Sequence, residues 1–556
     1  MRIFNHIFIG LILMFGCLAV FGQKKNNIIK DNLNTKSISK TWVSDQGNGT
    51  YRNPVIDADY SDPDVIRVGE DYYMVSSSFD AVPGLPILHS KDLINWTIIN
   101  HALLRQPPYE HFSKTQHGNG VWAPSIRYHN GEFYIYYPDP DFGIYLTKAK
   151  NPAGEWSLPI LVEAGKGLID PCPLWDENDK FYLAYAYAGS RSGIKSVIAI
   201  KELNSQGTKT ITTGKIVYDG HEFDPTIEGP KFYKRNGFCY IFAPAGGVST
   251  GWQLILRSKN IYGPYERKVA MDQGSTSING PHQGAWVVTQ TGEDWFFHFQ
   301  DKGVYGRVLH LQPMKWINDW PVIGEDKDGD GKGQPVMTFK KPNVGKLWPI
   351  STPAESDEFN DLSLGRQWQW QANPKATWSF MNVEKGTLRL YTDQIPDSAK
   401  NYYEVPNILL QKFPTEEFTV TTKLRFSPNL KLENERVGLM VMGLDYANIG
   451  LRSSKNGIYV VYGIAKGANK GKAEIEKTLG RLISKDVYFR VIVKKNGLCQ
   501  FSYSEDGVQF INAGELFQAE SGHWIGAKVG LFASRKDKTN DAGYADFDWF
   551  RLTATK

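Results

Sequence analysis

Apolar and polar residues alternate along this chain in short runs, and five of these runs open on an aromatic residue that follows a turn rich in Gly, Asn or Asp. Strict alternation indicates β-strands rather than helices. The starting positions differ by 61, 48, 57 and 57 residues, and they are Tyr72, Phe133, Phe181, Phe238 and Trp295. Repeats of this length, built from strands with no amphipathic helix, are typical of a β-propeller. The pattern predicts five blades over residues 50–340.

The repeat ends after Asp326, where a segment rich in Asp and Gly is followed by the Pro-containing stretch 341–354. Such composition predicts a linker. Alternation resumes over residues 355–556 in short strands separated by Gly and Asn turns, for example Val437–Val441 and Tyr488–Val493. Regular short strands of this kind predict an antiparallel β-sandwich as a second domain. The chain is therefore expected to be all-β.

The first 22 residues have the pattern of a signal peptide: Arg2, an apolar stretch from Ile7 to Phe21, and a cleavage site after Gly22. A polar leader, residues 23–49, follows. We therefore expect export to the periplasm or the medium. Lipid anchoring at Cys17 is disfavoured, because the residues before it fit a lipoprotein signal poorly and the apolar stretch continues past it. No later apolar run approaches the ~20 residues of a transmembrane helix.

Charge and cysteine content narrow the classes of function only slightly. The 63 Lys and Arg residues nearly balance 59 Asp and Glu, and no basic run is present, so nothing indicates a nucleic acid as partner. Three scattered cysteines outside the signal peptide predict no disulfide framework. Aromatic residues make up 13% of the chain, which suits stacking on sugar rings, although β-sheet cores account for most of them.

The positions ten or eleven residues before the aromatic runs carry the candidate chemistry. Three of the five hold a carboxylate followed by a proline: Asp62-Pro63, Asp170-Pro171 and Glu228-Gly229-Pro230. Trp122 and His282 hold the corresponding places in the other two repeats. Equivalent positions of a radial repeat face the same axial funnel, so these five side chains are predicted to converge on one pocket.

Three carboxyl groups in one pocket cannot all ionise freely, because like charges in a partly dry site move their pKa values apart. Hydrolysis of a glycosidic bond uses this difference, since one carboxylate activates water while a protonated partner donates to the leaving oxygen. Asp57, Asp59 and Asp64 are alternatives to Asp62. Asp62 is preferred because it shares the following proline and the repeat phase with Asp170.

Several blocks of the sequence resemble, in order, the signature motifs of glycoside hydrolase family 43, in the branch of β-xylosidases and α-L-arabinofuranosidases with a C-terminal sandwich. They are Tyr60–Ile66, Trp122–Ser125, Leu168–Pro171, Ile227–Lys231, Gly280–Trp286 and Tyr305–Leu311. The resemblance implies a five-bladed β-propeller, a concanavalin-like sandwich and an inverting mechanism. It also implies that Asp62 is the general base, Glu228 the general acid, and Asp170 the group that orients the acid and helps it to keep its proton.

The resemblance extends to four residues around the three acids. Trp122 and Phe79 would wall the terminal sugar subsite, with core packing as the alternative. Arg307 would pair with the orienting aspartate and with sugar hydroxyls, with a structural salt bridge as the alternative. His282 matches a position that holds a calcium ion in many relatives. Because calcium prefers oxygen ligands, a hydrogen-bonding pocket residue is the alternative there.

Two further places are candidates for a structural calcium ion, although the chemistry itself requires no cofactor. Asp326, Asp328 and Asp330 mimic the first half of a calcium loop, but Met337 stands where the bidentate Glu belongs, so a solvated linker is favoured. In the sandwich, Asp357 and Asp546 resemble a pair that holds calcium in lectin-like domains.

These observations predict an exported, exo-acting glycosidase that acts on an arabinose- or xylose-containing oligosaccharide or polysaccharide. Terminal α-L-arabinofuranose from hemicellulose is the favoured product, and a β-D-xylosidase is the close alternative. Both sugars present similar hydroxyl groups to a pocket closed at one end. A carbohydrate-binding protein without turnover is the alternative of another class. The three aligned carboxylates argue against it, because binding alone needs no such cluster.

Overall fold

The computed structural model describes residues 38–555, so the predicted signal peptide and most of the polar leader lie outside the described residues. In the part of the chain that it describes, the regular secondary structure is almost entirely β-strand. Its helical segments are all short: α1 (Gly189–Ser192) and the 3-10 turns at His111–Ser113, Gly303–Tyr305, Tyr402–Glu404, Ala468–Lys470 and Lys495–Gly497.

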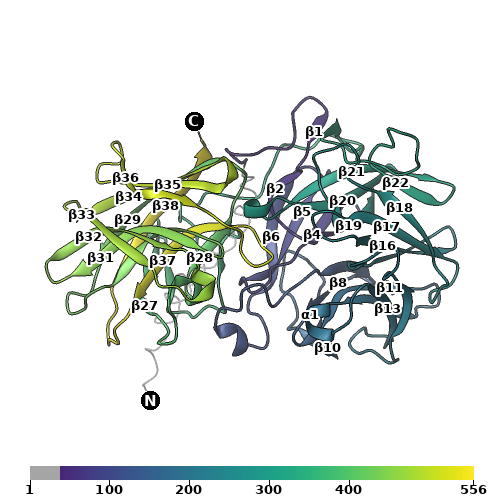
Figure 1. The fold of residues 1–556 in the computed structure, drawn as a ribbon, viewed down its shortest axis with the longest axis horizontal. Coiled ribbons are helices and arrows are strands. Elements are labelled where there is room, and N and C mark those ends of the chain that lie inside the picture. The colour runs from purple at the N-terminus through teal and green to yellow at the C-terminus, as the bar shows by residue number, and fades with distance from the viewer. Residues whose placement is uncertain (1–37, 556) are drawn as a thin grey trace, which may run out of the picture. The chain divides into compact units, whose positions relative to one another are not determined.

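The predicted five-bladed propeller is confirmed. Its first four blades are antiparallel sheets, each made of four strands that are consecutive in the chain (Figure 1). The first blade has β3 (Asp64–Val68), β4 (Asp71–Val75), β5 (Gly84–Ser90) and β6 (Trp96–Leu103). The second has β7 (Ser125–His129), β8 (Glu132–Asp139), β9 (Gly143–Ala149) and β10 (Ile160–Ala164), and the third has β11 (Leu168–Trp175), β12 (Phe181–Tyr187), β13 (Val197–Leu203) and β14 (Lys215–Asp219). The fourth has β15 (Lys231–Arg235), β16 (Phe238–Ala245), β17 (Trp252–Ser258) and β18 (Glu266–Met271).

The fifth blade is assembled from both ends of the propeller sequence. It contains β19 (His282–Val288), β20 (Asp294–Asp301), β21 (Arg307–Ile317) and β22 (Trp320–Ile323), and its remaining strand is β2 (Ile56–Asp59). Strand β2 precedes the first blade in the chain, yet it pairs with β21. This pairing closes the ring of blades and removes an open sheet edge.

The first strand of each blade is the innermost one. Contacts join β19 to β3, β3 to β7, β7 to β11 and β11 to β15, and the predicted aromatic runs form the second strands. Those second strands supply much of the apolar core of the propeller, where Tyr72, Phe133, Phe181 and Trp295 are buried. The segments that precede the first strands, and the acidic residues in them, therefore meet at one end of the inner ring.

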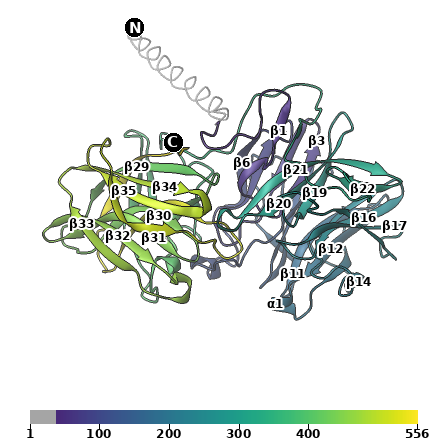
Figure 2. The same cartoon turned by 45° about the horizontal axis from the view of Figure 1, so that its top comes forward.

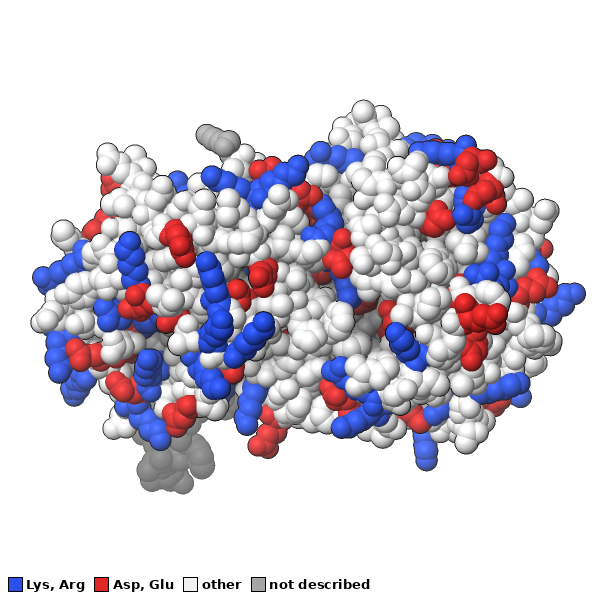
Figure 3. All heavy atoms as spheres, viewed as in Figure 1, with Lys and Arg blue, Asp and Glu red and all other residues white. Residues whose placement is uncertain are grey.

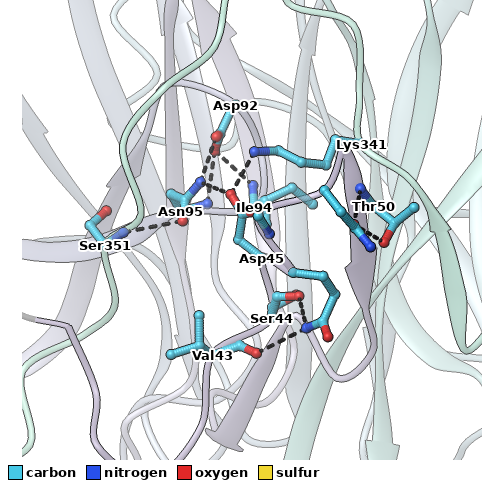
Figure 4. Close-up of polar contacts among 12 residues, drawn as sticks. Val43, Ser44, Asp45, Thr50, Asp92, Ile94, Asn95, Lys341 and Ser351 are labelled. Carbon is cyan, nitrogen blue, oxygen red and sulfur yellow. Dashed lines mark hydrogen bonds and ion pairs between the residues drawn. The ribbon is translucent and has the colours of Figure 1, made fainter.

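The chain on either side of the propeller is tied to its first blade. Strand β1 (Thr50–Arg52) pairs with β23 (Thr338–Lys340). The buried Asp45 carboxylate accepts hydrogen bonds from Asn95 Nδ2 at 3.0 Å and from Lys341 Nζ at 2.5 Å (Figure 4). Asn95 Oδ1 in turn accepts the main-chain N–H of Ser351 at 3.1 Å. One amide side chain thus connects the N-terminal segment with the predicted linker.

The second domain is a sandwich of two sheets, as predicted. Figure 2 shows β29, β34 and β35 in one layer and β30, β31 and β32 in the other. The larger sheet has eight strands: β24 (Gln369–Trp370), β27 (Asp393–Gln394), β28 (Leu409–Lys412), β30 (Arg436–Met442), β31 (Tyr446–Ser454), β32 (Gly457–Ala465), β33 (Ile475–Arg481) and β37 (Lys528–Arg535). The other has seven: β25 (Ser379–Asn382), β26 (Thr387–Tyr391), β29 (Phe418–Ser427), β34 (Asp486–Lys494), β35 (Leu498–Ser504), β36 (Ile511–Gln518) and β38 (Tyr544–Ala554).

Main-chain hydrogen bonds join the propeller to the sandwich. Val82 and Trp370 exchange two of them, at 3.0 and 2.6 Å, and Ala527 N donates to Val304 O at 2.8 Å. Asn373 adds side-chain bonds to the main chain of Gln106. These contacts bury polar main-chain groups of both domains, so each domain completes the hydrogen bonding of the other.

The surface and the cysteines agree with the expectations from composition. Side chains of both signs are interspersed over the face drawn in Figure 3. Cys172, Cys239 and Cys499 are buried free thiols. Within residues 38–555, no helix combines the length and the apolar character needed to cross a membrane.

Candidate active site

One pocket of about 220 Å³ brings together every pocket residue that the sequence predicts. The three acids and the four surrounding residues all line it: Asp62, Asp170, Glu228, Phe79, Trp122, His282 and Arg307. Trp524, from a loop of the sandwich, completes the wall. Residues separated by more than 450 positions in the chain therefore meet in one cavity.

A main-chain residue in the left-handed conformation lies close to the start of each inner strand that carries an acid, and it directs the acidic side chain. Asp62 has φ 56° and Asp170 has φ 57°, and Gly229 beside Glu228 has φ 59°. Asp tolerates this region better than most residues, whereas Gly adopts it without steric cost. In β11 the strand pairing also shifts register between Ile169 and Cys172. Such a bulge re-aims the side chain that it carries, here toward the pocket.

Asp62 is the more buried of the two acids that the sequence assigns to proton transfer. Ser77 Oγ donates a hydrogen bond of 2.5 Å to Asp62 Oδ2, and an Arg307 guanidinium nitrogen lies 3.6 Å from Asp62 Oδ1. The resemblance implies that Arg307 pairs with the orienting aspartate, Asp170. Among the described residues, however, the ion pair of Arg307 is with Asp62. These contacts fix the position of the Asp62 carboxylate at the pocket, as a general base requires.

Asp170 is fully enclosed and accepts a hydrogen bond of 2.7 Å from the main-chain N–H of Gly229. Burial raises the pKa of Asp170 well above that of an ordinary aspartic acid, and the neighbouring charges of Glu228 and Asp62 raise it further. The group of three acids therefore retains a proton at pH values where isolated carboxyl groups have lost theirs. Through Gly229, Asp170 also fixes the main chain that carries Glu228.

Glu228 is the most accessible of the three acids, with 30% of its side chain exposed. His282 Nε2 lies 2.8 Å from Glu228 Oε1, so the imidazole orients this carboxyl group. His282 is buried, and its other nitrogen, Nδ1, has no hydrogen-bond partner among the described residues. That nitrogen could accept a bond from water or ligate a cation. The hydrogen-bonding role is thus observed, whereas calcium binding at His282 stays a prediction.

Aromatic side chains wall the pocket. Phe79 is buried and its main chain pairs with Val121, next to Trp122. Trp122 Nε1 donates to Gly118 O at 2.8 Å, which fixes the indole ring. The ring of Trp524 lies edge-on to that of Trp122, with 6.2 Å between centroids. Trp524 has φ 66°, a rare conformation for so large a residue, and such strain is often found where a side chain must be aimed into a site.

The alternative acids lie outside this pocket. Asp64 Oδ2 accepts bonds from Arg127 at 2.6 Å and from Ile126 N at 2.8 Å, inside the propeller. Asp57 and Asp59 contact groups of the sandwich instead. The geometry therefore agrees with the choice of Asp62 over these neighbours.

The predicted calcium pair of the sandwich does not form a common site. Asp357 pairs with Phe550, four residues from Asp546 on β38, so the two aspartates are about 13 Å apart along the sheet. This separation is too large for one ion with ligands at about 2.5 Å. Asp546 instead makes two hydrogen bonds with Arg389, at 2.7 and 2.9 Å.

The three aspartates of the segment before the linker, in contrast, lie close together, which a freely solvated segment does not require. Carboxylate oxygens of Asp326, Asp328 and Asp330 are all within 4.8 Å of one another, which makes this group an acidic metal site candidate. Asp330 already has a cationic partner, because Lys332 Nζ lies 2.8 Å from it.

Sequence reasoning assigned no role to seven residues that line the pocket: Ala123, Ile169, Thr226, Gly247, Val248, Gln283 and Trp524. Thr226 precedes the motif Ile227–Lys231 and Gln283 lies within Gly280–Trp286, and both have positive φ, 58° and 35°. Trp524 has no counterpart in a repeat. Only a tryptophan between Gly522 and Gly526 marks that loop, and nothing in the sequence places it over the propeller.

Comparison with known proteins is consistent with this geometry. The profile of Glycosyl hydrolases family 43 matches residues 51–321, and that of the Beta xylosidase C-terminal Concanavalin A-like domain matches residues 356–553. The GH43 BlXynB protein from Bacillus licheniformis has a similar crystal structure, with a TM-score of 0.78 and 27% identity, covering 91% of this chain and 100% of that one.

Three named relatives are similar over most of their length. A Xylanibacter ruminicola protein with an attributed β-xylosidase activity is 40% identical over 503 residues, 89% of this chain and 88% of that protein. A β-xylosidase of Formosa agariphila is 34% identical, over 93% of this chain and 92% of that protein. The non-reducing end α-L-arabinofuranosidase BoGH43B of Bacteroides ovatus is 29% identical, over 90% and 94%. The chain belongs to glycoside hydrolase family 43 and carries the concanavalin A-like C-terminal domain of its β-xylosidases.

Proposed function

We propose that the protein is an exo-acting β-D-xylosidase that releases terminal xylose from xylo-oligosaccharides. The convergence of Asp62, Asp170 and Glu228 in one small pocket carries the assignment to glycoside hydrolysis. The names of the relatives from Formosa agariphila and Xylanibacter ruminicola favour xylose. They favour it over arabinofuranose, the product that the sequence alone led us to expect.

In the proposed reaction, Asp62 activates a water molecule while Glu228 protonates the leaving oxygen, with inversion at the anomeric carbon. Two contrasts support this division of roles. Asp62 is buried beside the Arg307 guanidinium, which stabilises a carboxylate. Glu228 lines the pocket with 30% of its side chain exposed, so a leaving group can reach it, and it contacts His282. Asp170 positions the Glu228 main chain through Gly229 and keeps a proton within the group of acids.

Exo action is supported by the shape of the pocket. Its volume of about 220 Å³ and its aromatic walls suit a single sugar ring rather than an extended chain. Trp122 and Trp524 stand on one side of it, edge to face. A terminal sugar can enter such a pocket only with its linkage directed outward.

A second candidate, α-L-arabinofuranosidase activity, is favoured by one observation. The Bacteroides ovatus relative bears that name and covers 90% of this chain. Both activities would use the same three acids. Only the positions of the pocket walls relative to the sugar hydroxyl groups would separate them.

The experiment is a direct comparison of 4-nitrophenyl β-D-xylopyranoside with 4-nitrophenyl α-L-arabinofuranoside, with xylobiose as the natural-type substrate. We expect kcat/KM to be higher for the xyloside and xylobiose to yield xylose. A higher value for the arabinofuranoside would assign the second activity. The Asp62→Ala variant is the control for contaminating glycosidases, and binding of xylobiose without turnover would identify a carbohydrate-binding protein instead.

We further propose that the protein is exported, on the strength of the apolar stretch from Ile7 to Phe21. The test is mass spectrometry of the N-terminus of the mature protein from its native host. Cleavage before Gln23 is expected. An intact Met1 would contradict this proposal, whereas a lipid-modified Cys17 would keep export but replace cleavage before Gln23 by anchoring.

A further inference from the structure

We propose that Asp59 is a positioning residue of the active site, whose carboxylate sets the main chain of Arg307 and the sandwich loop that carries Trp524 in one arrangement. This inference rests on the proposed glycosidase function. It explains how a loop of the second domain is aligned with the acids of the first.

Asp59 is the last residue of β2 and is only 4% exposed. Each of its oxygens accepts a main-chain hydrogen bond from a different domain. Arg307 N donates to Oδ1 at 3.0 Å, and Gly526 N donates to Oδ2 at 2.9 Å. Hydrogen bonds to a carboxylate are about twice as strong as neutral ones, and two at a fixed angle define a geometry. Asp59 therefore connects the propeller to residue 526 directly.

On the propeller side, this contact fixes the residue that pairs with the proposed base. The guanidinium of Arg307 lies 3.6 Å from Asp62 Oδ1 and 5.0 Å from the centre of the Phe299 ring. The preceding Gly306 has φ 75°, and a Cβ there would lie 2.5 Å from Asp59 Cγ. The segment before Arg307 thus packs against Asp59 without space for adjustment.

On the sandwich side, Gly526 lies two residues after Trp524. A Cβ on Gly526 would lie 2.6 Å from the carbonyl carbon of Tyr305, so the two loops are in van der Waals contact. The next residue, Ala527, donates to Val304 O at 2.8 Å. The Arg307 guanidinium is 5.9 Å from the centre of the Trp524 ring. Asp59 consequently holds both the loop of Trp524 and the main chain of Arg307.

Two partly buried lysines of the sandwich lie near Asp59. The Asp59 charge favours the protonated forms of Lys412, at the end of β28, and of Lys528, at the start of β37. Desolvation nevertheless lowers the pKa of Lys412 to about 8. Neutralising Asp59 would remove the acidic neighbour of Lys412 and leave Asp80 as that of Lys528, which is costly where access of water is restricted. The negative charge of Asp59 therefore contributes as well as its shape.

Asp57 supplies a matched control. It lies two residues earlier on β2, is 5% exposed, and also bridges the domains. Its partners are Thr415 Oγ1 at 2.7 Å and Lys302 Nζ at 3.3 Å. Among the described residues, its hydrogen bonds and ion pair go to Thr415 and Lys302, and neither Arg307 nor residues 522–527 are among its partners. Asp57→Asn therefore perturbs the same interface without touching the proposed link.

The experiment compares Asp59→Asn with Asp57→Asn in the full-length protein. Asn cannot accept a hydrogen bond at both oxygen positions, so one N–H would face an amide N–H. We expect Asp59→Asn to lower kcat/KM by ~10- to 10²-fold, the usual cost of a small misplacement in a site. Asp57→Asn should leave kcat/KM close to that of the unchanged protein.

Two further measurements separate positioning from loss of stability. In a double-mutant cycle, Asp59→Asn should have a smaller effect in an Arg307→Ala background than in the unchanged protein, because one of its two links acts by placing that side chain. Hydrogen exchange followed by mass spectrometry should show faster exchange in peptides covering 303–307 and 522–527 in Asp59→Asn only. Additive effects, or unchanged exchange in both peptides, would overturn the proposal.

The exchange measurement requires no substrate, so it remains decisive if neither nitrophenyl glycoside is hydrolysed and the proposed function fails. Should Asp59→Asn not fold, the comparison is made with Asp59→Glu and Asp57→Glu, which keep the charge but displace the oxygens by one methylene group. Equal losses of activity in these two variants would also contradict a specific role for Asp59.

Discussion

The propeller and the sandwich are both β-structures, but they differ in what their centres bury. The inner ring of the propeller buries charged and polar side chains, among them Asp64, Asp170, Lys231 and His282, at or within two residues of main-chain positions with positive φ. The sandwich encloses one continuous apolar cluster between its sheets, formed by residues such as Leu439, Phe489 and Phe547. Buried charge is costly, so the propeller gives up stability at its centre, whereas the space between the sandwich sheets is filled by apolar side chains.

The two domains therefore contribute different kinds of group to the active site. The propeller provides the ionisable groups at equivalent places in successive blades. The sandwich provides apolar closure through one irregular loop, residues 521–526, which is fixed by hydrogen bonds to Asp59 and Val304. We therefore expect changes in the propeller to alter chemistry, and changes in the sandwich to alter binding or assembly.

The largest effects are expected from the two propeller residues that we propose for proton transfer, Asp62 and Glu228. Glu228→Ala should lower kcat on xylobiose by ~10² to 10⁴, because a sugar leaving group must be protonated. It should spare dinitrophenyl glycosides comparatively, since a dinitrophenolate departs without a proton. Asp62→Ala should impair both substrates alike, because each needs an activated water molecule.

Proton NMR of the first-formed product completes this test and should show inverted anomeric configuration. Retention of configuration would contradict the assignment of Asp62 as a base. Equal damage by Glu228→Ala across leaving groups would remove its role as the acid.

Removing the sandwich is the next largest change. Truncation after Pro349 deletes Trp524 and the partners of Val82 and Gln106, and it exposes the buried face that carries Asp57 and Asp59. We expect insoluble protein, or soluble protein with kcat/KM reduced by ~10² or more. Size-exclusion chromatography and a nitrophenyl glycoside assay measure the two outcomes. A soluble, fully active propeller would show that the sandwich has no part in the site.

A single replacement in the sandwich loop should have a smaller effect. Trp524→Ala removes one aromatic wall of the pocket. Because Trp524 is 46% exposed, the free energy of unfolding should hardly change. We expect kcat/KM to fall ~10-fold, chiefly through KM, because an aromatic face for the sugar is lost. Phe380→Ala, at a 52% exposed aromatic on β25, is the matched control and should leave activity unaffected.

The smallest effect concerns stability and contrasts one aspartate from each domain. The folded-state pKa of Asp170 is raised above its unfolded value of 3.8, so its ionised form is disfavoured in the folded protein. Asp170 therefore costs no stability below pH 3.8; its cost grows as pH rises from 3.8 to the raised folded-state pKa and is constant above it. Asp170→Asn should raise Tm by about 2 to 4 °C at neutral pH, while lowering activity.

Asp357→Asn in the sandwich should have the opposite sign. Its carboxylate accepts three N–H groups, from Phe359, Gly365 and Trp368, at 2.9 to 3.1 Å. Burial raises the pKa of Asp357 as well, but Asn leaves at least one of these donors without an acceptor, and we expect that loss to outweigh the gain, so Tm should fall. Differential scanning fluorimetry at pH 4 and pH 7.5 measures both variants. A gain for Asp170→Asn that persisted undiminished at pH 4 would exclude the ionisation argument.

The parts of this molecule that the sequence predicted are those that repeat. Five residues hold equivalent positions in the five blades: Asp62, Trp122, Asp170, Glu228 and His282. Because the blades are arranged around one axis, side chains at equivalent positions face the same pocket. The partner of Arg307 and the separation of Asp357 from Asp546 depend instead on side-chain contacts that spacing does not determine. Trp524 and Asp59 were out of reach for the same reason, since both act across a boundary between two domains that have no common repeat.

The closure of the fifth blade has a consequence for synthesis. Strand β2 leaves the ribosome about 250 residues before its partner β21. At about 5 to 20 residues per second, this strand waits roughly 10 to 50 s as an unpaired edge. Asp59 lies on that strand, and its second partner, Gly526, is made later still. The last step of assembly, which joins the first and last parts of the chain, is therefore also the step that completes the pocket.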